Sequence, residues 1–417
     1  MPPPTRPSDV FRLPGFLGFW LADTVSAFGT QITTLALQVL VVVTLNGTAT
    51  DVGLINAARW TPYLLFGLVM GALVDRRRRR PLLIATDLGR AMLLGALPAL
   101  WLLRWLSLPV LMAFVAAFGL LTLVNDAASQ SILPRLVPRQ ALLAANARLD
   151  QGGTAAQTTG PLMAGALVTL LGAPLAVLAD AASYLFSGAM LAALKLEEPL
   201  PAAASTQRLV GEISDGLRWV YRHPTLAPLS ISTHAWFLFN SVLGAVFVPF
   251  AVRGLGLSAA ELGIALAAAG AAGLVGAVLA TRLGERWGVG PSVIGCRLLS
   301  PLACAVIALA PGGHGRAAAV AMLALGQAIY GFQLGAENAN EMSFRQTVTP
   351  DHLQGRVNTS MRSLNRAMVV VAAPLGGLLA DRIGFRPTLW IAAAGFLLVP
   401  LALAATPFGR AREGEPA

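Results

Sequence analysis

The sequence GALVDRRRRRP occupies residues 71–81, where one carboxylate and five arginines separate two long apolar segments. Arginine-rich connections between apolar segments are typical of chains that cross a bilayer, because basic residues accumulate in the loops on the cytoplasmic side. The stretch therefore predicts a membrane protein, and it predicts the side of the membrane on which this loop lies.

The composition of the whole chain leads to the same interpretation. Hydrophobic residues make up 56% of the 417 residues and charged residues 12%, and the mean hydropathy is +0.68. A chain of this length with so few polar residues cannot cover the surface of a soluble globule. The net charge of +10 would suggest nucleic acid in a soluble protein. Here the basic residues lie in loops beside apolar segments, so the expected partner is the lipid bilayer and no nucleic acid.

Apolar segments long enough to cross a bilayer as helices recur along the chain. We predict an all-α membrane protein with twelve transmembrane helices. The expected spans are residues 16–44, 51–75, 81–106, 108–132, 140–171, 174–194, 225–252, 258–283, 290–311, 316–344, 355–381 and 386–406.

The basic residues set the expected orientation. A cytoplasmic N-terminus places most of the 30 Lys and Arg residues in cytoplasmic segments. The outer segments then contain only Arg104, Arg253, Arg316, Arg382 and Arg386. The opposite orientation would invert the usual bias of basic residues toward the cytoplasm, so both termini are expected to be cytoplasmic.

The chain contains a weak internal repeat. NDA at 125–127 aligns with ENA at 337–339 at an offset of 212 residues, and DVGLI at 51–55 aligns with ELGI at 261–264 at an offset of 210. Two matches in nearly the same frame predict two pseudo-symmetric six-helix halves, the arrangement typical of secondary transporters.

The boundaries of these halves follow from the longest polar segment. We expect an N-terminal half at residues 1–194, a cytoplasmic linker at 195–224, and a C-terminal half at 225–417. A substrate site is then expected between the halves, near the middle of the membrane.

The loop at 71–81 also carries a family motif. The pattern Gly-x-Leu-x-Asp-Arg-x-Gly-Arg-Arg is matched by Gly71, Leu73, Asp75, Arg76, Arg79 and Arg80. In this motif the sequence resembles the major facilitator superfamily, and within it bacterial exporters similar to macrolide-efflux and enterobactin-exporter proteins. Arg78 replaces the glycine of the pattern. The resemblance implies a conformational latch formed by Gly71, Asp75 and the arginines Arg76, Arg79 and Arg80; the alternative is a loop that only sets topology.

A second group of residues resembles the antiporter motif of the same superfamily. It comprises Gly152, Gly160, Pro161 and Gly165 in the fifth expected span. Small residues permit close helix packing and proline bends a helix. The resemblance implies proton antiport, whereas the plainer interpretation is that glycine and proline are common in membrane helices.

Three acidic residues within expected spans are candidates for proton coupling: Asp23, Glu337 and Asp126. An ionised carboxylate inside a bilayer is costly unless it is hydrated or paired, so such residues mark ion pathways. The alternative for Asp23 is an interfacial residue solvated from the cytoplasm. Glu337 has no partner nearby in the sequence.

Polar residues repeat on one face of the first span at spacings of three and four, and other spans add further candidates for a substrate cavity. The candidates are Thr30, Thr34, Gln38, Arg59, Asn240, Tyr330 and Gln333.

Several classes of function are excluded. The only lysine, Lys195, has no Gly-Lys-Ser or Gly-Lys-Thr context, so the chain has no phosphate-binding loop for ATP hydrolysis. No Cys or His cluster has metal-ligand spacing, and no nucleophile motif stands out. We therefore expect no enzyme, no metal and no cofactor.

The resulting hypothesis is a secondary active transporter of the bacterial inner membrane. It would export a lipophilic small molecule in exchange for protons, by alternating access and as a monomer. The alternatives are an uptake symporter or facilitator for a nutrient or lysolipid, and a non-transporting membrane receptor or assembly protein.

Overall fold

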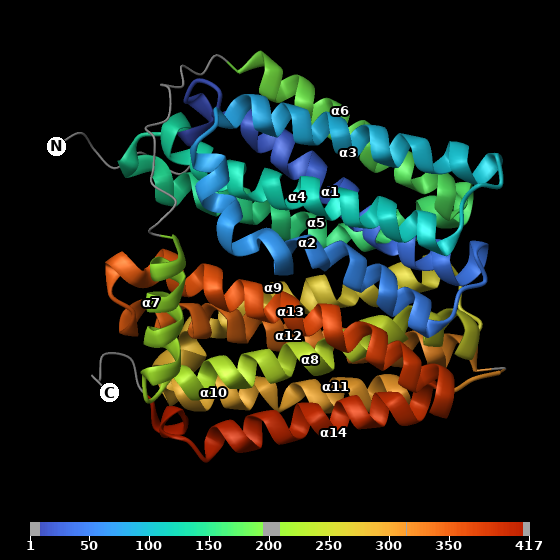
Figure 1. Ribbon diagram of the computed structural model, residues 1–417. Helices are drawn as coiled ribbons and strands as arrows, with labels where there is room; N and C mark the ends of the chain where they lie inside the picture. The colour runs from blue at the N-terminus through green and yellow to red at the C-terminus, as the bar shows by residue number, and fades with distance from the viewer. Residues whose placement is uncertain (1–8, 195–208, 314, 412–417) are drawn as a thin grey trace.

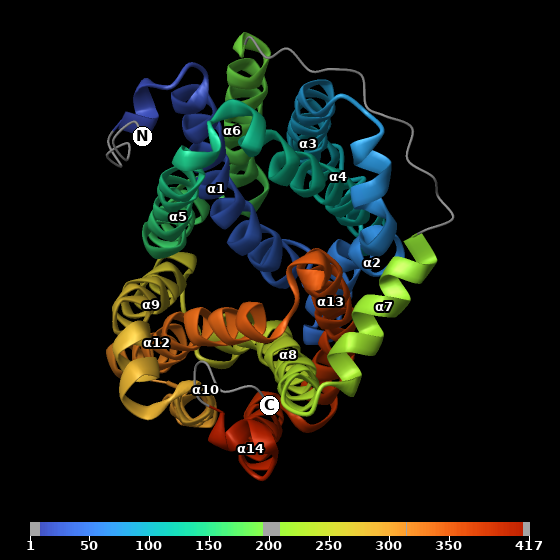
Figure 2. The same ribbon diagram turned by 90° about the vertical axis from the view of Figure 1, so that its left-hand side faces the viewer.

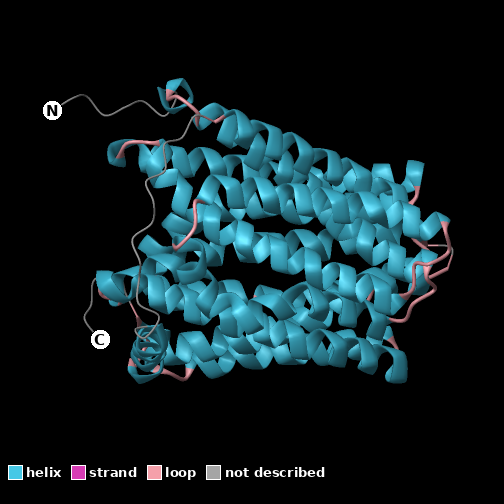
Figure 3. Ribbon diagram, turned by 45° about the horizontal axis from the view of Figure 1, so that its top comes forward, coloured by secondary structure: helices cyan, strands magenta, loops and turns pink. Residues whose placement is uncertain are grey.

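The computed structural model describes residues 9–194, 209–313 and 315–411. These residues are almost entirely helical and contain no strand (Figure 3). Two helical bundles lie side by side with their long axes roughly parallel, as Figure 1 shows. Both described ends of the chain lie at the same end of the molecule (Figure 1).

The first bundle is built from the helices that precede the linker. They are α1 (Phe16–Val39), α2 (Ala49–Asp75), α3 (Arg79–Leu102), α4 (Leu108–Leu136), α5 (Leu142–Leu171) and α6 (Ala173–Ala193).

The second bundle follows a short linker helix, α7 (Leu209–Arg222). Its helices are α8 (Leu226–Pro249), α9 (Ala259–Trp287), α10 (Val289–Arg297), α11 (Leu299–Ala308), α12 (Arg316–Val348), α13 (Asp351–Ile383) and α14 (Phe385–Ala404). Figure 2 views both bundles along their axes, with α7 crossing their ends beside α2 and α13.

Among the described residues, ten helical segments are long and apolar enough to cross a membrane. The other two expected spans correspond to α2 and α5, which contain 27 and 30 residues and are not among those ten. The all-helical membrane fold is confirmed, and the count of twelve spans stays a prediction. The expected boundaries of the halves also stay a prediction, and residues 195–208 of the linker lie outside the described residues.

One expected span is divided. Residues 290–311 were expected as one helix, but α10 ends at Arg297 and α11 begins at Leu299. Pro301 lacks the backbone N–H that would bond to the carbonyl of Arg297, so the helix breaks there. Together the two helices still form a 20-residue span.

Matching local structures show the pseudo-symmetry of the bundles. Thr48 and Ser258 each begin a helix with a capping box, in which Asp51 and Glu261 accept bonds from the respective cap. These pairs lie at the 210-residue offset of the repeat. A π-helix ends both preceding spans, at Leu40–Thr44 and at Phe250–Gly254.

The last two helices of each bundle are joined in the same way. Gly172 connects α5 to α6 with a φ of 80°, and Gly384 connects α13 to α14 with a φ of 94°. A positive φ favours glycine, so both bundles use a glycine for this one-residue turn. The repeat that was expected from sequence is therefore present in the backbone.

Candidate functional site

A cavity of about 1330 Å³ lies between the two bundles. We call it the central cavity. Its wall is formed by residues of α1, α4 and α5 from the first bundle and of α8, α9 and α12 from the second. A volume of this size exceeds that of ordinary drug-sized ligand pockets.

The central cavity extends toward the end of the molecule that carries both described termini. Its lining includes the first turns of α1, at Phe19 and Asp23, and the last part of α4, at Gln130 and Leu133. The beginning of α5 and the second half of α12 complete that end.

The opposite end is closed by contacts between the bundles. The Asp381 carboxylate in α13 accepts hydrogen bonds from the backbone N–H groups of Ala49 and Thr50, at 3.1 and 2.9 Å, and from the Thr50 hydroxyl at 2.5 Å. Arg253 donates to the carbonyl of Val42 at 2.9 Å. We call the Asp381 contacts the outer clamp, because this end is the outer one in the orientation expected from the sequence.

Glycines allow the backbones to approach at the same end. A Cβ on Gly53 would lie 2.3 Å from the carbonyl oxygen of Ala373, and a Cβ on Gly377 would lie 2.3 Å from that of Ala49. Only glycine permits this spacing of α2 and α13. The structure is thus closed at one end of the central cavity and open toward the other.

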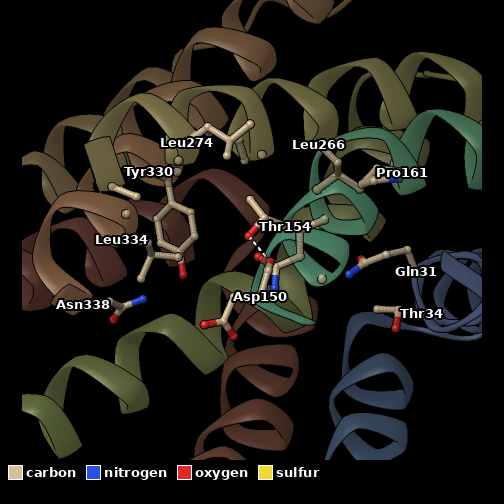
Figure 4. Close-up of a pocket in the computed structure, with 18 of the residues that line it drawn as sticks. Gln31, Thr34, Asp150, Thr154, Pro161, Leu266, Leu274, Tyr330, Leu334 and Asn338 are labelled. Carbon is tan, nitrogen blue, oxygen red and sulfur yellow. Dashed lines mark hydrogen bonds between the residues drawn. The ribbon is translucent and has the colours of Figure 1, made fainter. Parts of the chain in front are cut away.

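Two charged side chains of described residues line the cavity, and both are acidic. Among the described residues that line it, Asp23 and Asp150 are charged, and none is basic. Figure 4 shows the Asp150 carboxylate turned from its helix into the space between Asn338 and Thr34. Asp23 forms no hydrogen bond or ion pair with a described residue, and Asp126 and Asp150 are near enough to repel its charge. The charged groups that face the cavity are therefore anionic, while the Arg59 guanidinium lies behind Thr34.

Five of the sequence candidates line the cavity: Asp23, Thr34, Gln38, Asn240 and Tyr330. The Tyr330 hydroxyl donates to Asn240 Oδ1 at 2.6 Å, which joins α12 to α8. The Tyr330 ring also stacks on Trp236 with centroids 6.1 Å apart. An aromatic and an amide are therefore held in place on the wall formed by the second bundle.

Three of the candidates for the substrate cavity do not line it. Thr30 is within 3.2 Å of the Tyr184 hydroxyl, Arg59 donates to Thr34 at 3.2 Å, and Gln333 is fully buried and donates to Glu337. In this arrangement they lie outside the cavity lining, and their role at a substrate site stays a prediction. A single residue turns a helix by about 100°, so the neighbours Gln31 and Leu334 face the cavity instead.

Glu337 lies behind the cavity wall in a buried ion pair. Its carboxylate is 2.6 Å from Nε of Arg297 in α10, and Arg297 also contacts Glu341 at 3.0 Å. Ser232 and Thr233 of α8 accept further bonds from the same guanidinium. Arg297 is 1% exposed, so this cluster joins three helices inside the second bundle.

The first bundle has a related cluster at the repeat-equivalent place. Asp87 pairs with Arg90 on α3, and it also accepts from Asn125 of α4 at 3.1 Å and from Ser187 of α6 at 2.6 Å. Asn125 is the repeat mate of Glu337. Sequence reasoning missed Asp87, Arg90 and Arg297, although charged residues inside an apolar span were a usable signal.

Asp126 lies beside α2 and is not in the cavity lining. Its carboxylate accepts from the Tyr63 hydroxyl at 2.6 Å. Nearby, the Arg366 guanidinium of α13 lies 3.8 Å from the centre of the Trp60 ring of α2. This contact joins the two bundles outside the cavity.

The arginine loop is anchored to α6. Arg80 donates to the carbonyls of Leu191 and Ala192, at 3.0 and 2.6 Å, which are at the end of α6. A cation at a helix C-terminus is favourable. Arg79 is buried and Arg76 is exposed. The structure describes neither the side chain of Asp75 nor the burial of Gly71.

Arg78, which occupies the glycine position of the motif, needs no unusual backbone conformation. Arg78 has φ −68° and ψ 126°, an extended conformation that any residue adopts, and α3 begins directly after it. The substitution therefore does not strain the turn.

The glycine-proline motif of α5 forms close contacts on two sides. A Cβ on Gly152 would lie 2.3 Å from the Thr24 hydroxyl, and one on Gly160 would lie 2.8 Å from Gln31. A Cβ on Gly165 would lie 2.5 Å from the carbonyl of Ala259, in the other bundle. Pro161 lines the central cavity. The motif thus allows α5 to pack tightly between α1 and α9.

Comparison with known proteins decides the family. The family model described as Major Facilitator Superfamily matches residues 19–372 and 229–416, which together span most of the chain. The chain belongs to the Major Facilitator Superfamily. It is therefore a multi-pass membrane transporter rather than an enzyme.

Relatives within the superfamily include efflux pumps. The multidrug efflux pump Tap of Mycobacterium tuberculosis is 29% identical over 395 residues, which cover 90% of this chain and 89% of the relative. Tap of Mycolicibacterium fortuitum is 28% identical over 355 residues, covering 82% and 84%. An uncharacterized MFS-type transporter of Sinorhizobium fredii, y4rN, is 27% identical over 372 residues, covering 88% and 89%.

Solved structures share the fold at low sequence identity. The nucleoside transporter NupG has a TM-score of 0.76 and 12% identity, with 95% of this chain and 100% of that chain covered. A bacterial homologue of the iron transporter ferroportin, in an inward-facing state, has a TM-score of 0.72 and 16% identity, covering 93% and 97%. These similarities establish the superfamily fold.

Proposed function

We propose that this chain exports lipophilic organic cations in exchange for protons. The observation that carries the proposal is the central cavity, whose charged lining residues are the carboxylates Asp23 and Asp150. An anionic wall within low-dielectric surroundings attracts cations and repels anions. The described similarity to Tap efflux pumps supports the export direction.

The rest of the lining favours a lipophilic molecule. Phe19, Phe247, Leu266 and Leu334 supply apolar surface, and Tyr330 presents a ring to a cation. Amide groups such as Gln38 can bond to substrates of different shapes. A wide cavity with few fixed polar groups suits several related cations rather than one.

Proton exchange follows from competition at one carboxylate. Asp23 can hold an organic cation while it is ionised, or a proton while it is neutral, but not both. When the cation leaves on the outer side, a proton replaces it on Asp23. The neutral carboxyl then lowers the desolvation cost of the occluded state through which the transporter returns. Asp23 therefore fits this role better than Glu337, which is paired with Arg297.

The cycle would alternate between two arrangements of the bundles. In the arrangement described, the outer clamp is closed and the central cavity opens toward the termini. We place the termini in the cytoplasm of a bacterium and the chain in its inner membrane as a monomer, with two halves joined by the linker at 195–224. The loop with Gly71, Asp75, Arg76, Arg79 and Arg80 would stabilise one of the two arrangements as a latch, in part through the bonds from Arg80 to α6.

The proposal is tested by transport of tetraphenylphosphonium into inverted vesicles or proteoliposomes with an imposed pH gradient. We expect uptake to fall when a protonophore collapses the gradient. Asp23→Asn and Asp150→Asn should each lower cation transport about tenfold, because loss of one favourable charge contact of about 1.4 kcal/mol changes binding tenfold.

Glu285→Gln is the matched control, because Glu285 is an exposed acid on α9 that does not line the cavity. It should transport like the unmodified protein. Uptake that is unaffected by the protonophore would contradict proton exchange, and unchanged transport by both aspartate variants would contradict the cation site.

A further inference from the structure

A second pocket lies at the end of the molecule that carries the termini. It has a volume of about 560 Å³ and is formed by the end of α7, the turn that follows it, and the first turns of α13. Its lining residues are Arg218, Trp219, Arg222, His223, Pro224, Leu353 and Arg356. We call it the linker pocket, since α7 connects the two bundles.

The linker pocket collects hydrogen-bond donors and positive charge. Three of its seven lining residues are arginines, and none of the seven is acidic. Arg218 and Arg222 form no ion pair or hydrogen bond with any described residue. The Trp219 Nε1–H is buried and has no hydrogen-bond partner among the described residues. Such a set of donors is suited to an anion with several oxygens.

His223 adds a further hydrogen-bond donor, and the bonds to its ring indicate which nitrogen carries the proton. Its Nδ1 lies 3.4 and 3.3 Å from the backbone N–H donors of Thr225 and Leu226, at the beginning of α8. Burial lowers the pKa of His223 below its usual value, which favours the neutral ring. Because Nδ1 accepts these bonds, the remaining proton is on Nε2, where it can be donated.

The position of the pocket indicates where the anion comes from. Helix α7 crosses the ends of the bundles rather than running along them, as Figures 1 and 2 show. The ends of the spans are the level of the lipid headgroups, and α7 carries there the partly exposed Tyr221, whose hydroxyl bonds to His234 of α8. Gly216 packs α7 against the backbone of Arg356 in α13, which fixes the pocket wall.

We propose that the linker pocket binds the phosphate group of an anionic phospholipid. The lipid would hold α7 against α13 at the membrane surface. A soluble phosphate compound shares the same chemistry, and the experiment separates the two sources.

The test uses purified full-length protein in a neutral detergent, with thermal unfolding followed after addition of phosphatidylglycerol, phosphatidylcholine or inorganic phosphate. We expect phosphatidylglycerol to raise the unfolding temperature by about 3 °C or more, because a ligand of the native state stabilises it. Phosphatidylcholine and millimolar phosphate should give no shift. An equal shift with phosphate alone would overturn the lipid assignment, and equal shifts with both lipids would overturn the anion site.

Variants locate the effect. Arg218→Gln combined with Arg222→Gln should abolish the shift, while Arg218→Lys with Arg222→Lys should keep part of it as a folded, charge-retaining reference. The matched control is Arg282→Gln with Arg286→Gln, two exposed arginines of α9 that do not line the pocket. A full shift in the Arg218→Gln, Arg222→Gln protein would overturn the proposal.

Discussion

Arg297 is the residue whose removal should affect the second bundle most. Its guanidinium bonds to Glu337, Glu341, Ser232 and Thr233 from within a nearly sealed site. Removing one partner of a buried ion pair leaves a charge without compensation, and this is far more destabilising than the net value of the pair.

We predict that Arg297→Met lowers the stability of the protein by about 3–5 kcal/mol, because the buried Glu337 loses its cation. Glu341 keeps an ion pair with Arg345 at 3.7 Å. Thermal unfolding in detergent measures the effect. Arg286→Met, at an exposed site on α9, should change stability little. Adding Glu337→Gln to Arg297→Met should recover part of the loss, and the absence of any recovery would contradict the pairing.

At the scale of single residues, the sequence shows which polar residues a helix carries but not the direction in which each side chain points. Thr34 and Gln38 lie in the cavity lining, whereas Thr30, which was expected on the same polar face, packs against Tyr184. The partner of Glu337 could not be found by spacing, because Arg297 is 40 residues away in a different helix. Local spacing carries no information about such contacts.

Helix α5 shows how one element serves both bundles. It packs on α1 within its own bundle and on α9 in the other, and its glycines stand where the backbones come closest. The residue types of this motif were visible in the sequence. Which glycine faces which neighbour depends on the rotation of α5 about its axis, which the motif alone does not set.

We predict that Gly165→Ala impairs transport by about tenfold or more, because its Cβ would meet the Ala259 carbonyl and force α5 from α9, and overpacking of this kind costs about 1–3 kcal/mol. Gly95→Ala, on α3 and outside the cavity lining, is the same change with no atom within 4 Å of the new Cβ. Cation transport in vesicles compares them. Equal activity of the two variants would show that the α5–α9 contact is not limiting.

Element boundaries were predicted within a few residues, except where packing or proline intervenes. The span at 290–311 was expected as one helix, yet it breaks after Arg297. Pro301 was visible, but a proline in an apolar segment either bends or breaks a helix according to its neighbours. The expected spans at 51–75 and 140–171 are present as the helices α2 and α5.

At the scale of the whole molecule, the outer clamp joins the two bundles at the closed end of the central cavity. Asp381 bonds to α2 across the boundary between the bundles, whereas Asp51 at the same end bonds, among the described residues, to the cap of its own helix. We therefore expect the two carboxylates to affect the conformational equilibrium differently.

We predict that Asp381→Ala shifts the protein toward the arrangement open at the outer end. A cysteine introduced by Gln38→Cys in the cavity wall should then react about tenfold faster with a membrane-impermeant maleimide added from that end, since about 1.4 kcal/mol changes a population tenfold. The native Cys296 and Cys304 are buried and give a low background. Asp51→Ala should leave the rate unchanged, and a similar increase with Asp51→Ala would argue against a role for the clamp.

The exposed position of the outer clamp bears on which contacts a turnover has to break. Three hydrogen bonds join Asp381 to the other bundle, each of net value about 0.5–1.5 kcal/mol. In the proposed exchange one proton enters for each monovalent cation that leaves, so no net charge crosses the membrane and the voltage would do no net work. The driving force would then be the pH difference, about 1.4 kcal/mol for each pH unit. Turnover would break contacts between the halves, at the clamp and along α2 and α13, and would leave the buried ion pairs within each half intact.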